Sequence, residues 1–87
     1  MTNELRISNK RGLHARPAAK FVKIANQFSC DIFVERAGQK INGKSIMGLM
    51  MLAAGPGSIL TIHAQGQDAT QAIAELETLI QRRFGEE

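Results

Sequence analysis

A histidine, an arginine and a proline stand close together in the segment RGLHARPAAKFV, residues 11–22. His14 comes just before an apolar helical pattern, so its imidazole is expected near the N-terminus of a helix. The first backbone N–H groups of a helix have no partner inside the helix, and the helix dipole adds partial positive charge there. Such a position disfavours an imidazolium and favours a neutral, nucleophilic ring or a ring that carries an anion. The spacing therefore predicts that His14 could accept a negatively charged group.

A phosphoryl group is an anion that fits this position. It would meet the backbone N–H groups of Ala15 and Arg16 and the planar guanidinium of Arg16. Gly12 is expected to let the active site of a partner approach the backbone closely. Two helix frames are open, one with His14 as the N-cap and one with Arg16 as the cap and Pro17 as the first helical residue. An ordinary capping or surface histidine is the alternative, and the spacing alone leaves both interpretations open.

The second segment with possible chemistry is KSIMGLMML, residues 44–52. Ser45 fits the N-cap of a short helix that ends before the Gly-Pro-Gly run at 55–57. Its apolar side chains are too many for one thin core, and we expect Leu49 and Leu52 to be the buried ones. The others suit an adaptable docking patch on the surface, since flexible side chains can meet several partners. This predicted patch consists of Ile46, Met47 and Met50.

Charge is unevenly distributed along the chain. Residues 1–44 carry nine Lys and Arg against three acids, whereas residues 45–87 carry two against five. Arg16, Lys20 and Lys23 form a basic stripe on the first expected helix, which favours an acidic partner surface. Nucleic acid is a minor alternative, because the chain has no Trp or Tyr for stacking on bases.

Length and composition indicate one small domain, residues 1–87, without a large internal pocket. The single cysteine, Cys30, excludes an internal disulfide and is expected to be a small buried hydrophobe. His63 lies on the polar phase of a strand and is expected to be exposed and without a role. The spacing of these residues favours no metal site, and no cofactor motif is present. No targeting or membrane-spanning segment is recognised, so we expect a soluble cytoplasmic protein.

Apolar periodicity predicts seven elements in the order β-α-β-β-α-β-α. The strands are expected at 3–8, 30–35, 39–42 and 58–65, and the helices at 15–28, at 44–52 and from residue 69 to Phe84. Asp68 and Gln71 are expected to form a capping pair at the start of the last helix. Helices with apolar stripes that face one side of a mainly antiparallel sheet give an α+β two-layer domain. Element order alone does not separate this domain from a ferredoxin-like one.

The segments GLHARPAAKFV and GKSIMGLMMLAAGPGSIL together closely resemble the HPr family, the histidine-containing phosphocarriers of the bacterial phosphotransferase system. The resemblance extends over nearly the whole chain. It implies an open-faced β-sandwich in which a four-stranded antiparallel sheet carries three helices on one face. It also implies that enzyme I, charged from phosphoenolpyruvate, phosphorylates Nδ1 of His14, with Arg16 as the active-site arginine. The phosphoryl group would then pass to a histidine of an acceptor IIA domain, and the carrier itself would be a monomer and not an enzyme.

The same resemblance leaves several points open. In many bacteria the serine of the KSIMG segment, here Ser45, is the target of a kinase/phosphorylase, and a phosphate there would repel acidic partners. Some members of the family serve sugar uptake, and others belong to a nitrogen-related regulatory branch, which the segments FGEE and MLAAGPGS resemble slightly more. Some HPr-like proteins lack the histidine and act only by docking on a transcription factor or an enzyme. Whether the terminal Glu86 and Glu87 contact the site is open.

Overall fold

The computed structural model describes residues 1–85. Its four strands are β1 (Thr2–Arg6), β2 (Asp31–Arg36), β3 (Gln39–Asn42) and β4 (Ile59–Gln65). They form one antiparallel sheet in the order β1-β4-β2-β3. Alternate residues face the core, and the register sets Leu5 opposite Leu60 and Val34 opposite Ile62. The sheet therefore has one buried face and one face open to solvent.

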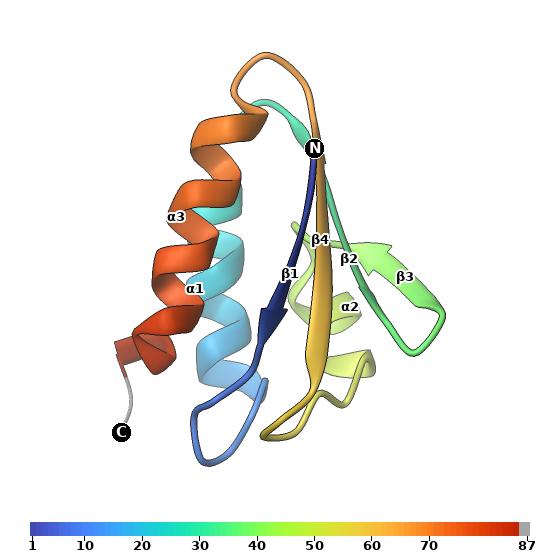
Figure 1. Ribbon diagram of the computed structural model, residues 1–87, viewed down its shortest axis with the longest axis vertical. Coiled ribbons are helices and arrows are strands. Elements are labelled where there is room, and N and C mark those ends of the chain that lie inside the picture. Colours follow the sequence, from blue (N-terminus) through green and yellow to red (C-terminus); the bar gives the residue numbers. More distant parts are fainter. Residues whose placement is uncertain (86–87) are drawn as a thin grey trace.

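Three helices cover the buried face of the sheet. They are α1 (Ala15–Ala25), α2 (Ile46–Met51) and α3 (Ala69–Gln81), and a 3-10 turn at Arg83–Gly85 follows α3. Figure 1 shows α1 and α3 side by side along the sheet, with the shorter α2 near β3. Phe21 of α1 and Leu76 of α3 are fully buried between the two layers. The predicted α+β architecture and the element order are confirmed, and within residues 1–85 no helix is long and apolar enough to cross a membrane.

The first helix is shorter than its apolar pattern predicts. It ends at Ala25, and the chain then tightens, with Gln27 N donating to Ile24 O at 3.0 Å and Phe28 N to Ala25 O at 3.2 Å. Phe28 still packs against the core, which explains why it extends the helical pattern without belonging to the helix. The first strand, expected at 3–8, lies at Thr2–Arg6.

The predicted Asp68–Gln71 capping pair is wrong. Asp68 is the N-cap residue of α3, but its side chain makes no cap hydrogen bond. Its carboxylate accepts hydrogen bonds from the backbone N–H of Ser29 at 2.9 Å and that of Cys30 at 3.0 Å. The loop before β2 thus competes successfully for the carboxylate, and Asp68 joins two loops instead of capping a helix.

The C-terminal end of α3 turns back toward α1. Phe84 lies in the 3-10 turn with a φ of 58°, outside the helix to which its periodicity assigned it. Its side chain is nevertheless buried, and its carbonyl accepts a hydrogen bond from Lys20 Nζ at 2.7 Å. This contact fixes the position of the turn on α1. Glu86 and Glu87, whose contact with the site the sequence leaves open, lie outside the described residues.

Candidate functional site

The helix frame at the candidate site is set by His14. It is the N-cap residue of α1, with extended backbone angles (φ −94°, ψ −166°), and Ala15 is the first helical residue. Of the two helix frames that the sequence allows, the structure has the one with His14 as the N-cap. Pro17, at the third helical position, is buried, and its missing N–H is tolerated because first-turn N–H groups have no helical acceptor. The side chain of His14 makes no cap hydrogen bond, so it does not serve the helix in the way Ser or Asp would.

The imidazole of His14 turns toward the preceding loop. Its Nδ1 atom lies 3.1 Å from the carbonyl oxygen of Gly12, and the side chain is half-buried. A carbonyl oxygen only accepts hydrogen bonds, so Nδ1 carries a proton in this arrangement. The same carbonyl also accepts from the backbone N–H of His14 at 3.1 Å. The ring is therefore held by the backbone two residues before it.

Gly12 is required by the packing of its own chain. Its φ is +68°, and a Cβ atom built on it would lie 2.4 Å from Ala54 O and 2.8 Å from Gly55 Cα. The next residue, Leu13, donates its backbone N–H to Ala54 O at 2.8 Å. We expected Gly12 to leave room for a partner, whereas the space it leaves is filled by the segment that follows α2.

That following segment, residues 52–58, supports the loop that carries His14. Gly57 N donates to Ile7 O at 2.7 Å and Ile7 N donates to Ser58 O at 2.9 Å, which ties the segment to the chain after β1. Arg36, at the end of β2, donates hydrogen bonds to both ends of the segment 52–58. Its guanidinium lies 3.1 Å from Leu52 O and 3.3 Å from Ser58 Oγ. These long-range supports were missed, because nothing in residues 52–58 or in Arg36 signals contact with residue 13.

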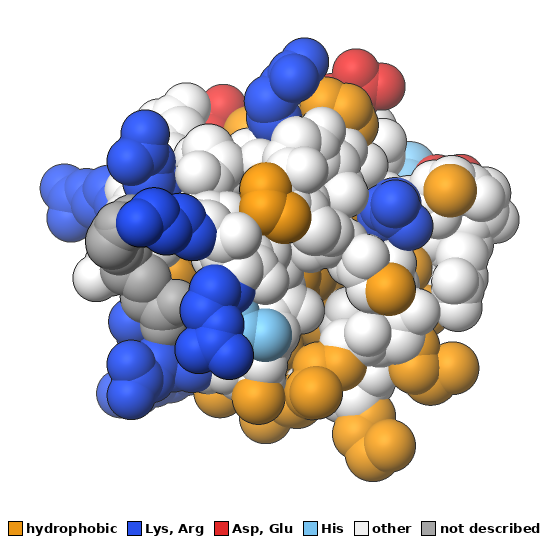
Figure 2. All heavy atoms as spheres, turned by 90° about the horizontal axis from the view of Figure 1, so that it is seen from below, with side chains coloured by type: hydrophobic (Ala, Val, Ile, Leu, Met, Phe, Trp, Pro, Cys, Tyr) orange, Lys and Arg blue, Asp and Glu red, His pale blue; other side chains and the backbone are white. Residues whose placement is uncertain are grey.

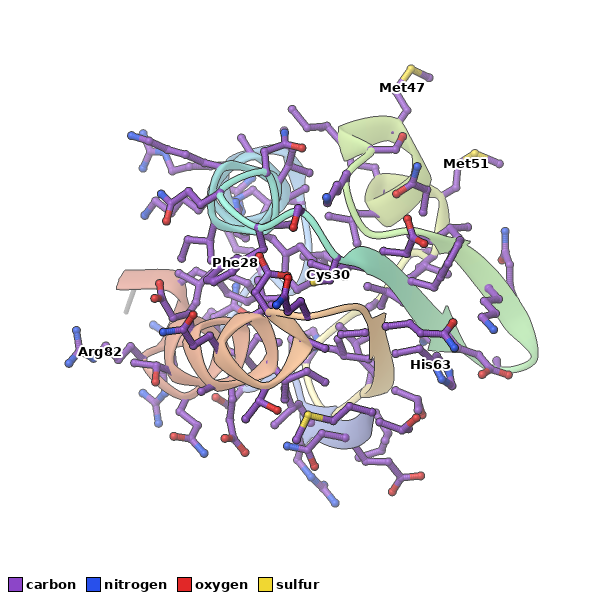
Figure 3. All side chains as sticks on the ribbon, turned by 90° about the horizontal axis from the view of Figure 1, so that it is seen from above. Phe28, Cys30, Met47, Met51, His63 and Arg82 are labelled. Carbon is purple, nitrogen blue, oxygen red and sulfur yellow. The ribbon has the colours of Figure 1, made fainter. Side chains whose placement is uncertain are left out.

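The α2 segment matches its prediction closely. Ser45 is the N-cap of α2, and its Oγ accepts a hydrogen bond from Gly48 N at 3.0 Å. Leu49 and Leu52 are buried, as expected. The exposed apolar side chains, which we call the α2 patch, are Ile46 at 41%, Met47 at 74%, Met50 at 44% and Met51 at 65%. Met47 and Met51 point away from the body of the molecule (Figure 3). Met51 was missed, although its spacing of four from Met47 places both on one side of a helix.

The basic stripe lies on α1, the helix that packs against α2. Arg16 and Lys23 are exposed on α1, whereas Lys20 is half-buried and holds the carbonyl of Phe84. Seen from the end of the molecule drawn lowest in Figure 1, basic side chains gather on one side and apolar side chains on the other (Figure 2). The end of the molecule seen in Figure 2 thus combines positive charge with exposed apolar area, a combination that suits an acidic protein partner.

Two remaining candidates from the sequence lie elsewhere. We expected His63 to be exposed and without a role, but it has a side-chain partner. Its side chain is 28% exposed, and its Nε2 lies 3.0 Å from Glu35 Oε1 on the open face of the sheet. Cys30 is buried, as expected, and burial together with the neighbouring Asp68 carboxylate raises the pKa of its thiol. Among residues 1–85 no group of three or more His, Cys, Asp or Glu side chains could hold a metal ion.

A four-stranded sheet with three helices on one face and a histidine at the start of α1 define an open-faced α+β carrier domain. A family profile described as "PTS HPr component phosphorylation site" matches residues 1–82. The chain belongs to the HPr family of phosphocarrier proteins, which are not enzymes.

The relatives fall into two groups at similar identity. The HPr-like protein Crh of Bacillus subtilis is 51% identical over 72 residues, 83% of this chain and 85% of Crh. The phosphocarrier protein HPr of Neisseria meningitidis serogroup A is 43% identical over 86 residues, 99% of this chain and 97% of that protein.

Solved structures agree with the fold. The crystal structure of HPr-C-His from Thermoanaerobacter tengcongensis superimposes with a TM-score of 0.96 at 47% identity, covering 100% of this chain and 98% of that one. A structure described as an HPr dimer from the same bacterium reaches 0.80 at 49% identity over 94% of each chain. Membership of the family implies enzyme I and IIA-type acceptors as partners.

Proposed function

We propose that this protein accepts a phosphoryl group from phosphorylated enzyme I on Nδ1 of His14 and passes it to a histidine of a IIA-type acceptor. The observation that carries the proposal is the position of His14 as the N-cap of α1, with a side chain that does not cap the helix. The helix dipole and the first backbone N–H groups favour an anion there, and Arg16 is the second residue of the helix.

In the uptake step the ring must first leave the carbonyl of Gly12. Its proton then resides on Nε2, which leaves a lone pair on Nδ1. That lone pair attacks phosphorus, and the bond between phosphorus and enzyme I breaks with its electron pair remaining on enzyme I. In the delivery step a ring nitrogen of the acceptor histidine attacks phosphorus. The N–P bond to His14 then breaks, and its electron pair remains on Nδ1. Arg16 and the N-terminus of α1 would stabilise the phosphoryl oxygens in both steps.

The test is incubation with phosphoenolpyruvate and a cognate enzyme I, followed by a search for an acid-labile adduct. The wild type should take up one phosphoryl group, and His14→Ala should take up none. Ring 15N and 31P NMR of the adduct should place the phosphorus on Nδ1. Absence of an adduct on the wild type, or one that persists in His14→Ala, would contradict the proposal.

Ser45 is proposed as a regulatory phosphorylation site, the substrate of an HPr kinase/phosphorylase. It stands half-buried at the edge of the α2 patch, where its Oγ accepts a hydrogen bond from the backbone N–H of Gly48. A phosphate there would place negative charge beside Ile46 and Met47 and repel acidic partners. Ser45→Asp should therefore slow the phosphorylation of His14 by enzyme I, with Ser45→Ala as the control. Equal rates for Ser45→Asp and the wild type would remove the support for this site.

The second candidate function is regulatory docking without transfer, on a transcription factor or an enzyme. It is favoured by the similarity to Crh, whose identity to this chain matches that of the phosphocarriers. The α2 patch would suit regulatory docking as well as it suits phosphoryl transfer. His14 and Arg16, in contrast, would have no role in docking alone. The adduct experiment separates the two functions, because only the carrier takes up phosphate.

We further propose that the protein acts in the cytoplasm as a monomer, with Ile46, Met47, Met50, Lys20 and Lys23 in contact with its partners. Monomeric action would leave both the α2 patch and the basic stripe open to enzyme I. Light scattering at micromolar concentration should give the mass of a single chain, and a stable dimer would contradict this. The choice between the sugar and the nitrogen-related branch is tested by which purified IIA domain accepts the phosphoryl group.

A further inference from the structure

Asn9 is a polar residue buried beneath the His14 loop. Its side chain is 1% exposed, and its Nδ2 donates a hydrogen bond to Gly12 O at 2.8 Å. Its Oδ1 is buried and, among residues 1–85, has no hydrogen-bond partner. An amide satisfied on one side only is a poor choice for stability, because an apolar side chain of similar size would avoid the unpaired oxygen. The bond from Nδ2 to Gly12 O is therefore the contact that explains an asparagine at this position.

The carbonyl that Asn9 binds is the one that also holds the candidate nucleophile. Gly12 O receives three donors: Asn9 Nδ2 at 2.8 Å, His14 N at 3.1 Å and His14 Nδ1 at 3.1 Å. A carbonyl oxygen has two lone pairs, so three donors compete for them. The bond from Asn9 is the shortest, and it comes from a side chain that packing holds in place. The ring of His14 is therefore left with a shared acceptor.

Asn9 is not needed to orient this carbonyl. The peptide unit that contains Gly12 O also contains the N–H of Leu13, which donates to Ala54 O at 2.8 Å. The direction of Gly12 O is thus fixed from the other side of the same planar unit. What Asn9 adds is a second, permanent donor on an oxygen whose direction is already set.

We infer that Asn9 is a positioning residue for phosphoryl uptake at His14, an inference that rests on the function proposed above. With Nδ1 bound to Gly12 O, the nitrogen carries a proton and has no lone pair for phosphorus. When the ring turns away, its proton moves to Nε2 through solvent and Gly12 O loses one donor. That oxygen keeps its bonds from Asn9 and from the backbone N–H of His14, and the competition from Asn9 weakens the bond that the ring must break. Asn9 thereby lowers the free-energy cost of exposing the Nδ1 lone pair.

The first test needs no phosphoryl donor. Long-range 1H–15N spectra of the neutral ring report how much of His14 carries its proton on Nδ1 and how much on Nε2. In Asn9→Leu the ratio of Nδ1–H to Nε2–H should rise about two- to tenfold, the factor that one hydrogen bond between neutral groups carries. Ile7→Val, an equally buried position in the same stretch whose side chain is not bonded to Gly12 O, is the matched control and should keep the wild-type ratio.

The second test measures the rate of phosphoryl uptake from enzyme I. Asn9→Leu should be slower than Ile7→Val by a similar factor at equal folded fractions. An unchanged or lower Nδ1–H ratio in Asn9→Leu, or an unchanged uptake rate, would overturn the inference. If Asn9→Leu does not fold, Asn9→Ala removes the donor without adding volume, and a wild-type ring with Nδ1 unprotonated would overturn the inference without any variant. Failure of the carrier function itself appears separately, as the absence of an adduct on the wild type.

Discussion

The N-termini of α1 and α2 carry reactive side chains at the same position but use them in opposite ways. Ser45 caps α2 with its hydroxyl, which accepts from Gly48 N, and so it satisfies the helix from within. His14 caps α1 with its backbone only, and its ring is directed back to Gly12 O. The short helix is stabilised by the side chain of its cap residue, whereas the long helix is stabilised by packing and has a cap side chain that makes no cap hydrogen bond.

An uncapped helix is not by itself evidence of a binding site. The side chain of Asp68 also leaves its helix uncapped, because its carboxylate is occupied by Ser29 and Cys30. What distinguishes the α1 terminus is the loop before it, which holds the imidazole with a backbone carbonyl and is itself held by residues 52–58. The three termini differ in what their cap side chains bind, and each of these contacts can be removed separately.

The largest expected effect is at the loop that carries His14. Gly12→Ala would force a Cβ atom to within 2.4 Å of Ala54 O at a φ of +68°. Left-handed strain and overpacking together should lower the free energy of unfolding by about 2–5 kcal/mol. Urea denaturation measures this loss. A Gly12→Ala protein with the stability of the wild type would show that residues 52–58 support the loop only weakly.

Gly57→Ala is the matched control for that change. Gly57 has a φ of +88°, but among residues 1–85 no atom beyond its own chain neighbours lies within 4 Å of the position of an added Cβ. Only the conformational part of the cost then remains, about 1 kcal/mol or slightly more. The difference between the two alanine variants isolates the contact of Gly12 with the segment after α2.

A smaller effect separates the two caps directly. Ser45→Ala removes the hydrogen bond to Gly48 N and should cost about 1 kcal/mol of stability. His14→Ala removes no cap bond, and Gly12 O keeps its bond from Asn9, so this variant should lose less stability than Ser45→Ala. Thermal and urea unfolding of both variants check the order. A greater loss in His14→Ala than in Ser45→Ala would mean that the imidazole serves the helix after all.

The caps also show what the sequence could and could not reveal. The cap at Ser45 and the burial of Leu49 follow from local patterns, because caps and apolar spacing act within one or two turns. The same patterns left two helix frames open at His14, and the fold decides between them. Asp68 looked like a cap of the same kind, and it failed because Ser29, 39 residues away in sequence, competes for its carboxylate. The same holds for Arg36 and Ala54, whose partners Leu52 and Leu13 are far away in sequence and are set by the fold. Local signals therefore found the candidate nucleophile but not the groups that hold it.

The smallest effect is expected from Asp68, because its carboxylate lies at the surface. The backbone N–H of Ser29, followed by the side chain and the backbone N–H of Cys30, holds the pKa of Asp68 below its ordinary value. A lowered pKa in the folded state means that the carboxylate adds stability above the ordinary value of about 4 and loses it as the pH falls toward the lowered value. Asp68→Asn should thus be less stable than the wild type at pH 7, because its amide has one accepting oxygen and can replace only one of the two bonds. The difference in urea midpoint should shrink between pH 5 and pH 3, and Asp31→Asn reports the general effect of removing a surface carboxylate. A difference in urea midpoint that stays constant between pH 5 and pH 3 would contradict this prediction. It would show that the N–H groups of Ser29 and Cys30 do not stabilise the charged carboxylate of Asp68.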